Sequence, residues 1–189
     1  MIINKIYDNI YEIENFITDE ECQEILEIAY LSKEEDWHVD KDEYNTSEFW
    51  SDKSLYLYTN PPEVINNIND RVSTFFKSFD HITKINAIHR FSKDVAMGRH
   101  KDNYTKMGNI SSAYGVVLYY NDNYLGGEIE YPDLNIKLKP KAKSLIIHAG
   151  DILHGTTPVQ SDSIRYFSTS FIREKDGTKV KLNPEIFGG

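Results

Sequence analysis

The chain of 189 residues contains a single cysteine, Cys22, so no disulfide can form within it. No apolar segment approaches the roughly 20 residues that a membrane-spanning helix needs. Residues 1–5 also lack the basic and apolar regions of a secretory signal peptide. We therefore expect a cytoplasmic protein, in which Cys22 is a small buried side chain on a helix.

Positive charge is also scarce, because 21 Lys and Arg stand against 30 Asp and Glu and give a formal net charge of −9. A protein that binds nucleic-acid phosphates needs a clustered basic surface, so nucleic acid is not an expected partner. Because no segment is long enough to span a membrane, a membrane is not an expected partner either. One basic cluster is present, formed by Lys139, Lys141 and Lys143 at a predicted turn. We interpret it as solvated surface, with a docking patch for an acidic substrate as the alternative.

The length and the hydrophobic content of 40% predict one domain over residues 1–189, long enough to bury a sizeable core. We expect a region of supporting helices and loops over 1–84, a catalytic core over 85–173 and a C-terminal tail over 174–189.

Two helices are predicted in the first region. A capping box from Thr18 to Glu21 begins a helix whose apolar residues continue to Tyr30 at helical spacing. A second helix is predicted to begin at Pro61-Pro62 and to end near Phe79, with one apolar stripe that packs against a sheet.

The core region is predicted to consist of short strands separated by turn signals such as Gly126-Gly127 and Pro140-Lys141. The predicted strands cover residues 85–91, 113–120, 128–131, 134–138, 144–148 and 165–173. Many short strands at this spacing favour a mainly β protein with supporting helices, built on a double-stranded β-helix, the jelly roll also found in cupins.

A His-x-Asp triplet in this region is a candidate metal site. Such a triplet is short enough to occur by chance, and the chain contains two of them, at His38 and at His100. The first lies in a charge-dense stretch without periodicity, which indicates a solvated loop. The second follows a predicted strand, and in an extended segment His100 and Asp102 point to the same side, toward one ion.

The region from about 85 to 173 resembles the catalytic core of the Fe(II)/2-oxoglutarate-dependent dioxygenases, most closely the prolyl 4-hydroxylase-like branch. The motifs that carry the resemblance follow the family's order: His100-Lys101-Asp102, Gly126-Gly127-Glu128-Ile129-Glu130-Tyr131-Pro132, Lys139-Pro140-Lys141-Ala142-Lys143-Ser144-Leu145, Leu153-His154-Gly155 and Arg165-Tyr166. The N-terminal part of the chain shares no specific motif with the family.

The resemblance implies that His100, Asp102 and His154 bind Fe(II) and form the catalytic centre. Two histidines and one carboxylate hold one face of an octahedral iron and leave the other positions open. Arg165 is then implied to bind the far carboxylate of 2-oxoglutarate. The reaction would consume O2 and convert 2-oxoglutarate to succinate and carbon dioxide, with ascorbate as a reductant. A carboxylate at Asp102 favours hydroxylation over halogenation, because related halogenases lack it.

Two departures from the family pattern concern the cosubstrate site. Phe91 stands where many members have a tyrosine whose hydroxyl helps to bind 2-oxoglutarate, and Tyr119, Tyr56 or Tyr58 is a candidate to replace that contact, unless it is absent. Phe91 and Tyr119 are accordingly assigned to this site. The basic residue is Arg165 where collagen-type enzymes have lysine, and an arginine fork preserves carboxylate binding.

The remaining histidines are interpreted as structural: His89 and His148 as packed or hydrogen-bonded core residues, and His38 and His81 as surface. Glu128 is expected to serve local structure. Two polar stretches, 36–52 and 103–112, are predicted to be either surface loops or a lid that contacts the substrate.

The substrate implied by the resemblance is a prolyl residue of a peptide or protein. One alternative is an oxygenase that acts on a free amino acid or another small molecule. Another is a jelly-roll module that binds a metal and a ligand without turnover. The oligomeric state is left open by the sequence.

Overall fold

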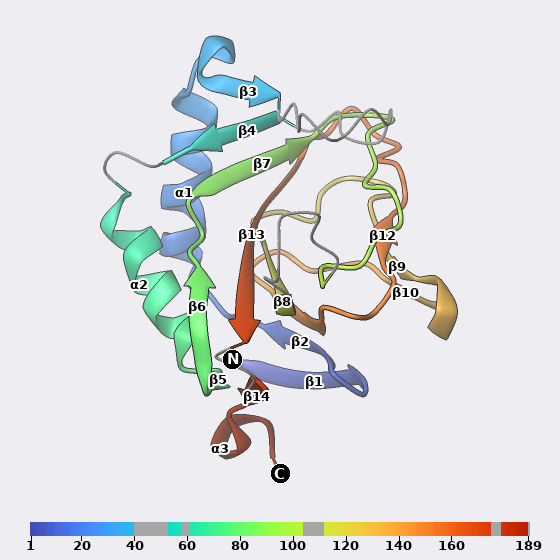
Figure 1. Cartoon of the computed structure of the whole chain (residues 1–189). Coiled ribbons are helices and arrows are strands. Elements are labelled where there is room, and N and C mark those ends of the chain that lie inside the picture. The colour runs from blue at the N-terminus through green and yellow to red at the C-terminus, as the bar shows by residue number, and fades with distance from the viewer. Residues whose placement is uncertain (40–52, 58–60, 104–111, 175–178, 189) are drawn as a thin grey trace.

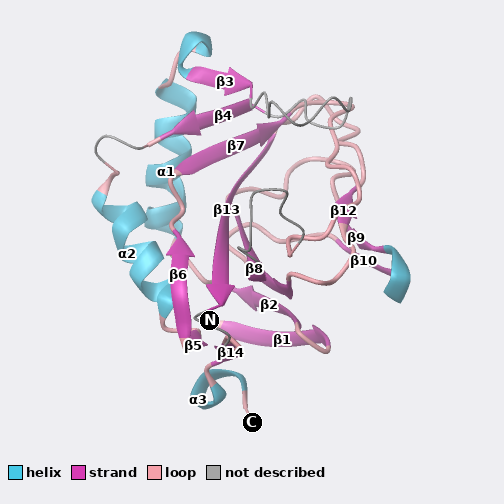
Figure 2. Ribbon diagram, in the orientation of Figure 1, coloured by secondary structure: helices cyan, strands magenta, loops and turns pink. Residues whose placement is uncertain are grey.

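The computed structural model describes residues 1–39, 53–57, 61–103, 112–174 and 179–188. Figure 1 shows three layers: two helices on one side, a large antiparallel sheet in the middle and a small sheet on the other side. Figure 2 shows the same arrangement by secondary structure, in which strands predominate. A mainly β fold with supporting helices was predicted, and the structure confirms it.

The large sheet has nine strands within the described ranges, in the order β1-β2-β11-β8-β13-β7-β4-β3, with β6 added to β13. Their bounds are β1 Ile2–Tyr7, β2 Ile10–Glu14, β3 Trp37–Val39, β4 Lys53–Tyr56, β6 Phe79–Thr83, β7 Ala87–Phe91, β8 Ser112–Tyr119, β11 Leu145–Ala149 and β13 Arg165–Glu174. The small sheet, β10-β9-β12, is formed by β9 Ile129–Tyr131, β10 Ile136–Leu138 and β12 Gly155–Thr156. Together the two sheets form the predicted jelly roll.

Strand β13 shows how the sequence separates the two faces of the large sheet. Tyr166 and Ile172 pack into the core cluster beneath the helices, whereas Phe167 belongs to a second cluster on the opposite face. Because side chains alternate along a strand, Arg165 lies on the same face as Phe167. The period of the strand therefore directs the arginine into the space between the two sheets.

Helix α1 (Asp19–Leu31) begins as predicted, with the capping box between Thr18 and Glu21. Cys22 on this helix is buried, and its thiol donates to the carbonyl of Tyr120. None of the described helices combines the length and the apolar character that a membrane-spanning helix needs.

Helix α2 (Glu63–Ser73) is shorter than predicted, because the chain after it enters β5 (Phe76–Lys77) and then β6. The apolar residues up to Phe79 fitted a helical stripe and so concealed this boundary. The physical reason lies at the other end of the chain. Asn183 donates from its side chain to the carbonyl of Thr74 and from its backbone to that of Phe75, which ends the helix with a tertiary contact.

The two terminal regions differ from the prediction. Residues 1–84 were expected to be helices and loops, yet they contribute β1 to β4 and β6 to the large sheet. The predicted tail forms β14 (Lys181–Leu182), which pairs with β5, and the short helix α3 (Pro184–Phe187). The helix seats Phe187 against Tyr11 and Phe75. Both ends of the chain therefore belong to the packed fold.

Two local predictions need correction. The strand predicted over 134–138 begins only at Ile136, because Pro132–Leu134 forms the 3-10 turn η2. The loop predicted from Asp36 onward begins with structure: the 3-10 turn η1 (Glu34–Asp36) leads into β3. Trp37 on β3 is buried and the Arg90 guanidinium lies 4.4 Å from its ring centre, so Trp37 is a core residue. The rest of that loop, 40–52, and residues 104–111 lie outside the described residues.

Candidate active site

His100 and His154, 54 positions apart, lie side by side in the space between the sheets. Their backbones form an isolated antiparallel bridge, with the N–H of each donating to the carbonyl of the other at 2.8 and 2.9 Å. Gly155 permits this approach, because a Cβ there would lie 3.0 Å from the carbonyl oxygen of Met97 and 3.2 Å from Cα of Arg99. The glycine after the second histidine is therefore explained by close backbone packing.

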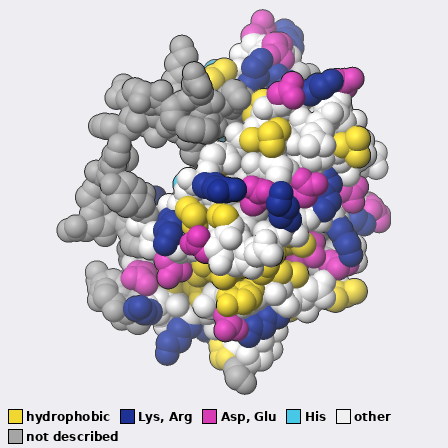
Figure 3. All heavy atoms as spheres, turned by 90° about the vertical axis from the view of Figure 1, so that its right-hand side faces the viewer, with side chains coloured by type: hydrophobic (Ala, Val, Ile, Leu, Met, Phe, Trp, Pro, Cys, Tyr) yellow, Lys and Arg dark blue, Asp and Glu magenta, His cyan; other side chains and the backbone are white. Residues whose placement is uncertain are grey.

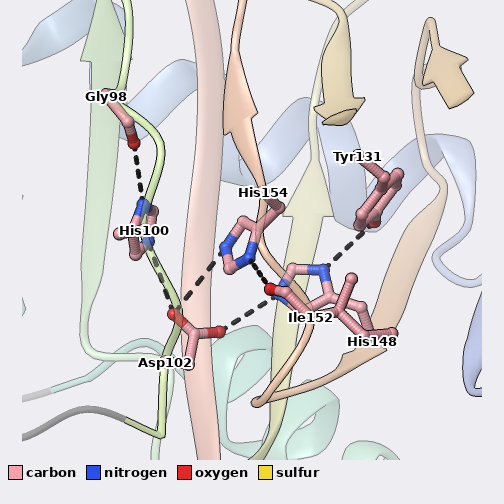
Figure 4. A network of polar contacts seen from close by, with 7 residues as sticks. All are labelled: Gly98, His100, Asp102, Tyr131, His148, Ile152 and His154. Atoms are coloured by element: carbon pink, nitrogen blue, oxygen red, sulfur yellow. Dashed lines mark hydrogen bonds and ion pairs between the residues drawn. The ribbon is translucent and has the colours of Figure 1, made fainter. Parts of the chain in front are cut away.

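Each of these histidines has its Nδ1 atom beside a backbone carbonyl. The Nδ1 of His100 is 2.8 Å from the oxygen of Gly98, and that of His154 is 3.0 Å from the oxygen of Ile152 (Figure 4). A carbonyl oxygen can only accept, so each Nδ1 carries a proton, and in the neutral ring Nε2 then has the lone pair. This is the tautomer that a histidine needs to bind a metal through Nε2.

Asp102 completes the cluster with a carboxylate oxygen. Its Oδ1 lies 3.4 Å from Nε2 of His100 and 3.7 Å from Nε2 of His154. Ligand atoms of the three residues all lie within 4.8 Å of one another, which brings together the triad that the sequence predicted. Such a cluster of two nitrogens and one oxygen is suited to a divalent transition metal.

The charges in this cluster also suit a cation. Burial would raise the pKa of Asp102, but the neighbouring His100 and His148 side chains outweigh burial and hold that pKa well below its usual range. Burial lowers the pKa of His154 to about 3, with help from the neighbouring His148. At neutral pH the carboxylate is therefore ionised and the His154 ring is neutral, as metal ligands must be.

A cavity of about 230 Å³ opens beside the triad, between the two sheets. Residues of β8, β11 and β13 line one side of it, and Ile129 and Thr156 of the small sheet line the other. Among the described residues that line the cavity, Arg165 is the one lysine or arginine. The cavity therefore combines a candidate metal site with a single fixed positive charge.

Arg165 is only 1% exposed and begins β13 as predicted. Its guanidinium carbon lies 4.5 Å from the ring centre of Phe167 and 5.2 Å from that of Phe91. Its Nη2 donates to the hydroxyl of Tyr119 at 3.1 Å. Within the described part of the chain, its Nε and Nη1 have no hydrogen-bond partner. A buried guanidinium with unused donors indicates a site for an anion.

The structure distinguishes the tyrosines that the sequence could not. Tyr119 is buried beside Arg165, whereas Tyr56 lies on β4 next to His38, and Tyr58 is outside the described residues. Tyr124 was missed by the sequence reasoning. Its hydroxyl is buried without a partner among described groups, and the positive charge of Arg165 opposes the rise in pKa that burial causes there.

The other described histidines have the predicted structural roles, and two of them also reach the site. His89 is hydrogen-bonded as expected, to Ser54 and Thr169, but it also lines the cavity. His148 is buried and hydrogen-bonded as expected, yet its partner is Asp102 of the triad. His38 is exposed, and the side chain of His81 is not among those described.

The lysine cluster and Glu128 have local partners. Lys139 donates to the carbonyls of Tyr124 and Gly126, so it is a structural residue where solvated surface was predicted. Lys141 and Lys143 pair with acidic residues, Glu14 and Asp19 respectively. Glu128 accepts from the hydroxyl of Thr157, which confirms its structural role. Figure 3 shows basic and acidic side chains interspersed on the face that carries the small sheet.

No protein-family model matches the sequence, and no curated protein matches it either. Solved structures do match the fold. A prolyl hydroxylase from Trichoplax adhaerens, in complex with a hypoxia-inducible factor peptide fragment, is 19% identical with a TM-score of 0.71, covering 88% of this chain and 84% of that one.

Two further prolyl hydroxylases share the architecture. A viral collagen prolyl hydroxylase from Paramecium Bursaria Chlorella virus-1 is 16% identical with a TM-score of 0.61, over 91% of this chain and all of that one. A prolyl-4-hydroxylase from Pseudomonas putida is 13% identical with a TM-score of 0.65, over 88% and 93%. At these identities the likeness establishes a shared fold.

Proposed function

We propose that the protein is an Fe(II)/2-oxoglutarate-dependent dioxygenase that hydroxylates a C–H bond, with a prolyl residue in a peptide or protein as its substrate. One observation carries the proposal: a triad of two histidines and an aspartate shares a cavity with a buried arginine whose donors are unused. A metal site alone would not require the arginine. The prolyl hydroxylase folds of the structural neighbours support the same function.

The ligand atoms fit Fe(II). His100 and His154 each direct Nε2 into the cluster while a backbone carbonyl holds Nδ1, and Asp102 directs Oδ1 to the same place. Two histidines and one carboxylate on one face of the metal are typical of non-haem iron oxygenases. A structural zinc site, in contrast, is closed by a fourth protein ligand. The described cluster holds three, so positions remain for other ligands.

The arginine fits the far carboxylate of 2-oxoglutarate. A guanidinium binds a carboxylate through its N–H groups, and the donors at Nε and Nη1 of Arg165 have no partner among the described residues. Phe91 and Phe167 pack on the guanidinium and exclude water, which strengthens its attraction for an anion. We assign the hydroxyls of Tyr119 and Tyr124 as further partners of that carboxylate. They would replace the tyrosine that is missing at position 91.

In this mechanism the protein positions the reactants. Arg165 would hold the far end of the cosubstrate, and His100, Asp102 and His154 would hold the Fe(II) at a fixed distance from it. When bound, the iron supplies the oxidising chemistry that couples decarboxylation of 2-oxoglutarate to insertion of oxygen into a C–H bond. Asp102 keeps a carboxylate where a halide would otherwise bind, which favours hydroxylation. Ascorbate as a reductant and a cytoplasmic location are further parts of the proposal.

The proposed substrate is tested by measuring succinate formation with proline-containing peptides and with free amino acids in parallel. We expect peptides to stimulate the release of succinate above the uncoupled rate, with one hydroxyl group appearing on the peptide for each succinate. The reason is that an extended, proline-rich segment loses little conformational entropy when it binds. Stimulation by free amino acids alone would contradict the peptide substrate and leave the oxygenase in place.

The alternative is a module that binds metal and ligand without turnover. Both proteins would hold Fe(II), so metal content does not distinguish them. An oxygenase consumes O2 and 2-oxoglutarate in equal amounts once the Fe(II) protein is exposed to air, whereas the binding module returns 2-oxoglutarate unchanged. Measurement of residual 2-oxoglutarate by mass spectrometry separates the two functions.

A further inference from the structure

The two oxygens of Asp102 face different partners. Oδ1 lies toward the Nε2 atoms of His100 and His154, at 3.4 and 3.7 Å. Oδ2 points the other way, to Nε2 of His148 on β11 at 3.1 Å (Figure 4). His148 is 1% exposed, so the contact is shielded from bulk solvent. His148 therefore contacts one carboxylate oxygen and leaves the other directed toward the two histidines of the triad.

Tyr131 on β9 lies at the other ring nitrogen of His148. Its hydroxyl lies 3.2 Å from Nδ1 of His148. A carboxylate oxygen can only accept, so Nε2 of His148 carries the proton in the contact with Oδ2 of Asp102. With its proton on Nε2, the ring accepts at Nδ1, and the hydroxyl of Tyr131 donates to it. The chain of contacts from Tyr131 to His148 to Asp102 thus crosses from the small sheet to the metal triad.

Gly115 on β8 leaves the space that the hydrogen bond between His148 and Asp102 occupies. It is paired with His148 across the two strands. A Cβ at position 115 would lie 2.2 Å from Oδ2 of Asp102 and 2.5 Å from Nε2 of His148, inside the contact itself. Its backbone does not adopt the positive φ that would call for glycine. The absence of a side chain is therefore explained by the room that the pair needs.

A role for His148 as a fourth metal ligand does not fit this geometry. The ligand atoms that lie within 4.8 Å of one another belong to His100, Asp102 and His154, and His148 is not among them. Its Nε2 is directed at a carboxylate oxygen, and a nitrogen that carries a proton cannot bind a metal.

We propose that His148 is a positioning residue that makes Asp102 a one-oxygen ligand. The inference rests on the proposed function. A carboxylate that binds through both oxygens would take two of six positions and, with the two histidines, leave two open. Held at Oδ2 by His148, Asp102 takes one position and leaves three, which is the number that a two-point cosubstrate and O2 require together.

The experiment compares Mn(II) binding to wild type, His148→Phe and His148→Gln by isothermal titration calorimetry, with Mn(II) as a redox-stable probe. His148→Phe removes the donor, and we expect Mn(II) affinity to fall about 10- to 100-fold, the usual loss when a partner of a metal ligand is removed. His148→Gln restores an N–H at a similar place and should recover most of the affinity. Gly115→Ala should resemble His148→Phe, whereas His38→Gln, at an exposed histidine, should resemble wild type.

A second measurement needs no variant. Nitrogen-15 NMR of the metal-free wild-type protein reports which ring nitrogen of His148 carries the proton, and we expect a proton on Nε2. A bare Nε2 would overturn the inference, as would unchanged Mn(II) affinity in His148→Phe. Three imidazole nitrogens on Mn(II) in pulsed EPR would also overturn it, since His148 would then be a ligand. Failure of the wild type to bind Mn(II) at all would instead contradict the proposed function.

Discussion

Replacement of His154 with alanine is expected to abolish stoichiometric Fe(II) binding and to reduce 2-oxoglutarate turnover to background. The residue supplies one of three ligand atoms, and its ring is already in the neutral form with Nε2 free. Removal of a residue that only hydrogen-bonds to a metal ligand lowers metal affinity about 10- to 100-fold. Removal of a ligand itself should lower the affinity further. Anaerobic titration with Fe(II), followed by a succinate assay, gives both quantities.

The chain offers a matched control for this variant. His38 begins the second His-x-Asp triplet but is exposed on β3, away from the cavity. His38→Ala should therefore bind Fe(II) and turn over 2-oxoglutarate as wild type does. Retained activity in His154→Ala, or loss of bound metal in His38→Ala, would show that the metal lies elsewhere.

Replacement of Arg165 with alanine should weaken 2-oxoglutarate binding about 30-fold to several thousand-fold. Removing one partner of a desolvated charge pair costs on the order of 2 to 5 kcal/mol, and Arg165 is the one cation among the described cavity residues. Fe(II) affinity should change far less, because the arginine contacts no triad residue through a described hydrogen bond. Calorimetry with the Mn(II)-loaded protein measures the cosubstrate affinity without turnover.

Two further variants show whether the effect belongs to the site. Arg165→Lys keeps the charge but loses the fork, so its affinity should fall between those of wild type and Arg165→Ala. Arg71 on α2 forms an ion pair with Glu21 on α1 and does not line the cavity. Arg71→Ala should therefore leave 2-oxoglutarate affinity unchanged. Unchanged affinity in Arg165→Ala would require another carboxylate anchor.

The predictable parts of the site are those that a local pattern determines. His100 and Asp102 share a side because they are two residues apart in extended backbone, and Arg165 enters the cavity because β13 alternates. The order of short strands between them was read from turn signals. The shared direction of His100 and Asp102 and the jelly roll therefore follow from short stretches of sequence, whereas the roles of His154 and Arg165 were implied by the family resemblance.

The unpredicted parts depend on contacts between distant residues. His148 was expected to be a core histidine. Its ring meets Asp102, 46 positions away, because the segment of Asp102 lies beside the end of β11, where the N–H of Asn103 donates to the carbonyl of Gly150. Helix α2 ends at Ser73, and the next residue, Thr74, accepts a hydrogen bond from the side chain of Asn183. No local sequence pattern predicts this contact. Tyr124 was overlooked because the packing beside Arg165, and not its own neighbours in sequence, makes its hydroxyl available.

A crystal structure grown without oxygen, in the presence of Fe(II) and 2-oxoglutarate, tests the central claim most directly. The account predicts one metal ion bound by Nε2 of His100, Nε2 of His154 and a single oxygen of Asp102. It also predicts that 2-oxoglutarate chelates this ion and extends its far carboxylate to Arg165. A metal bound away from the triad, or a 2-oxoglutarate carboxylate that does not contact Arg165, would contradict it.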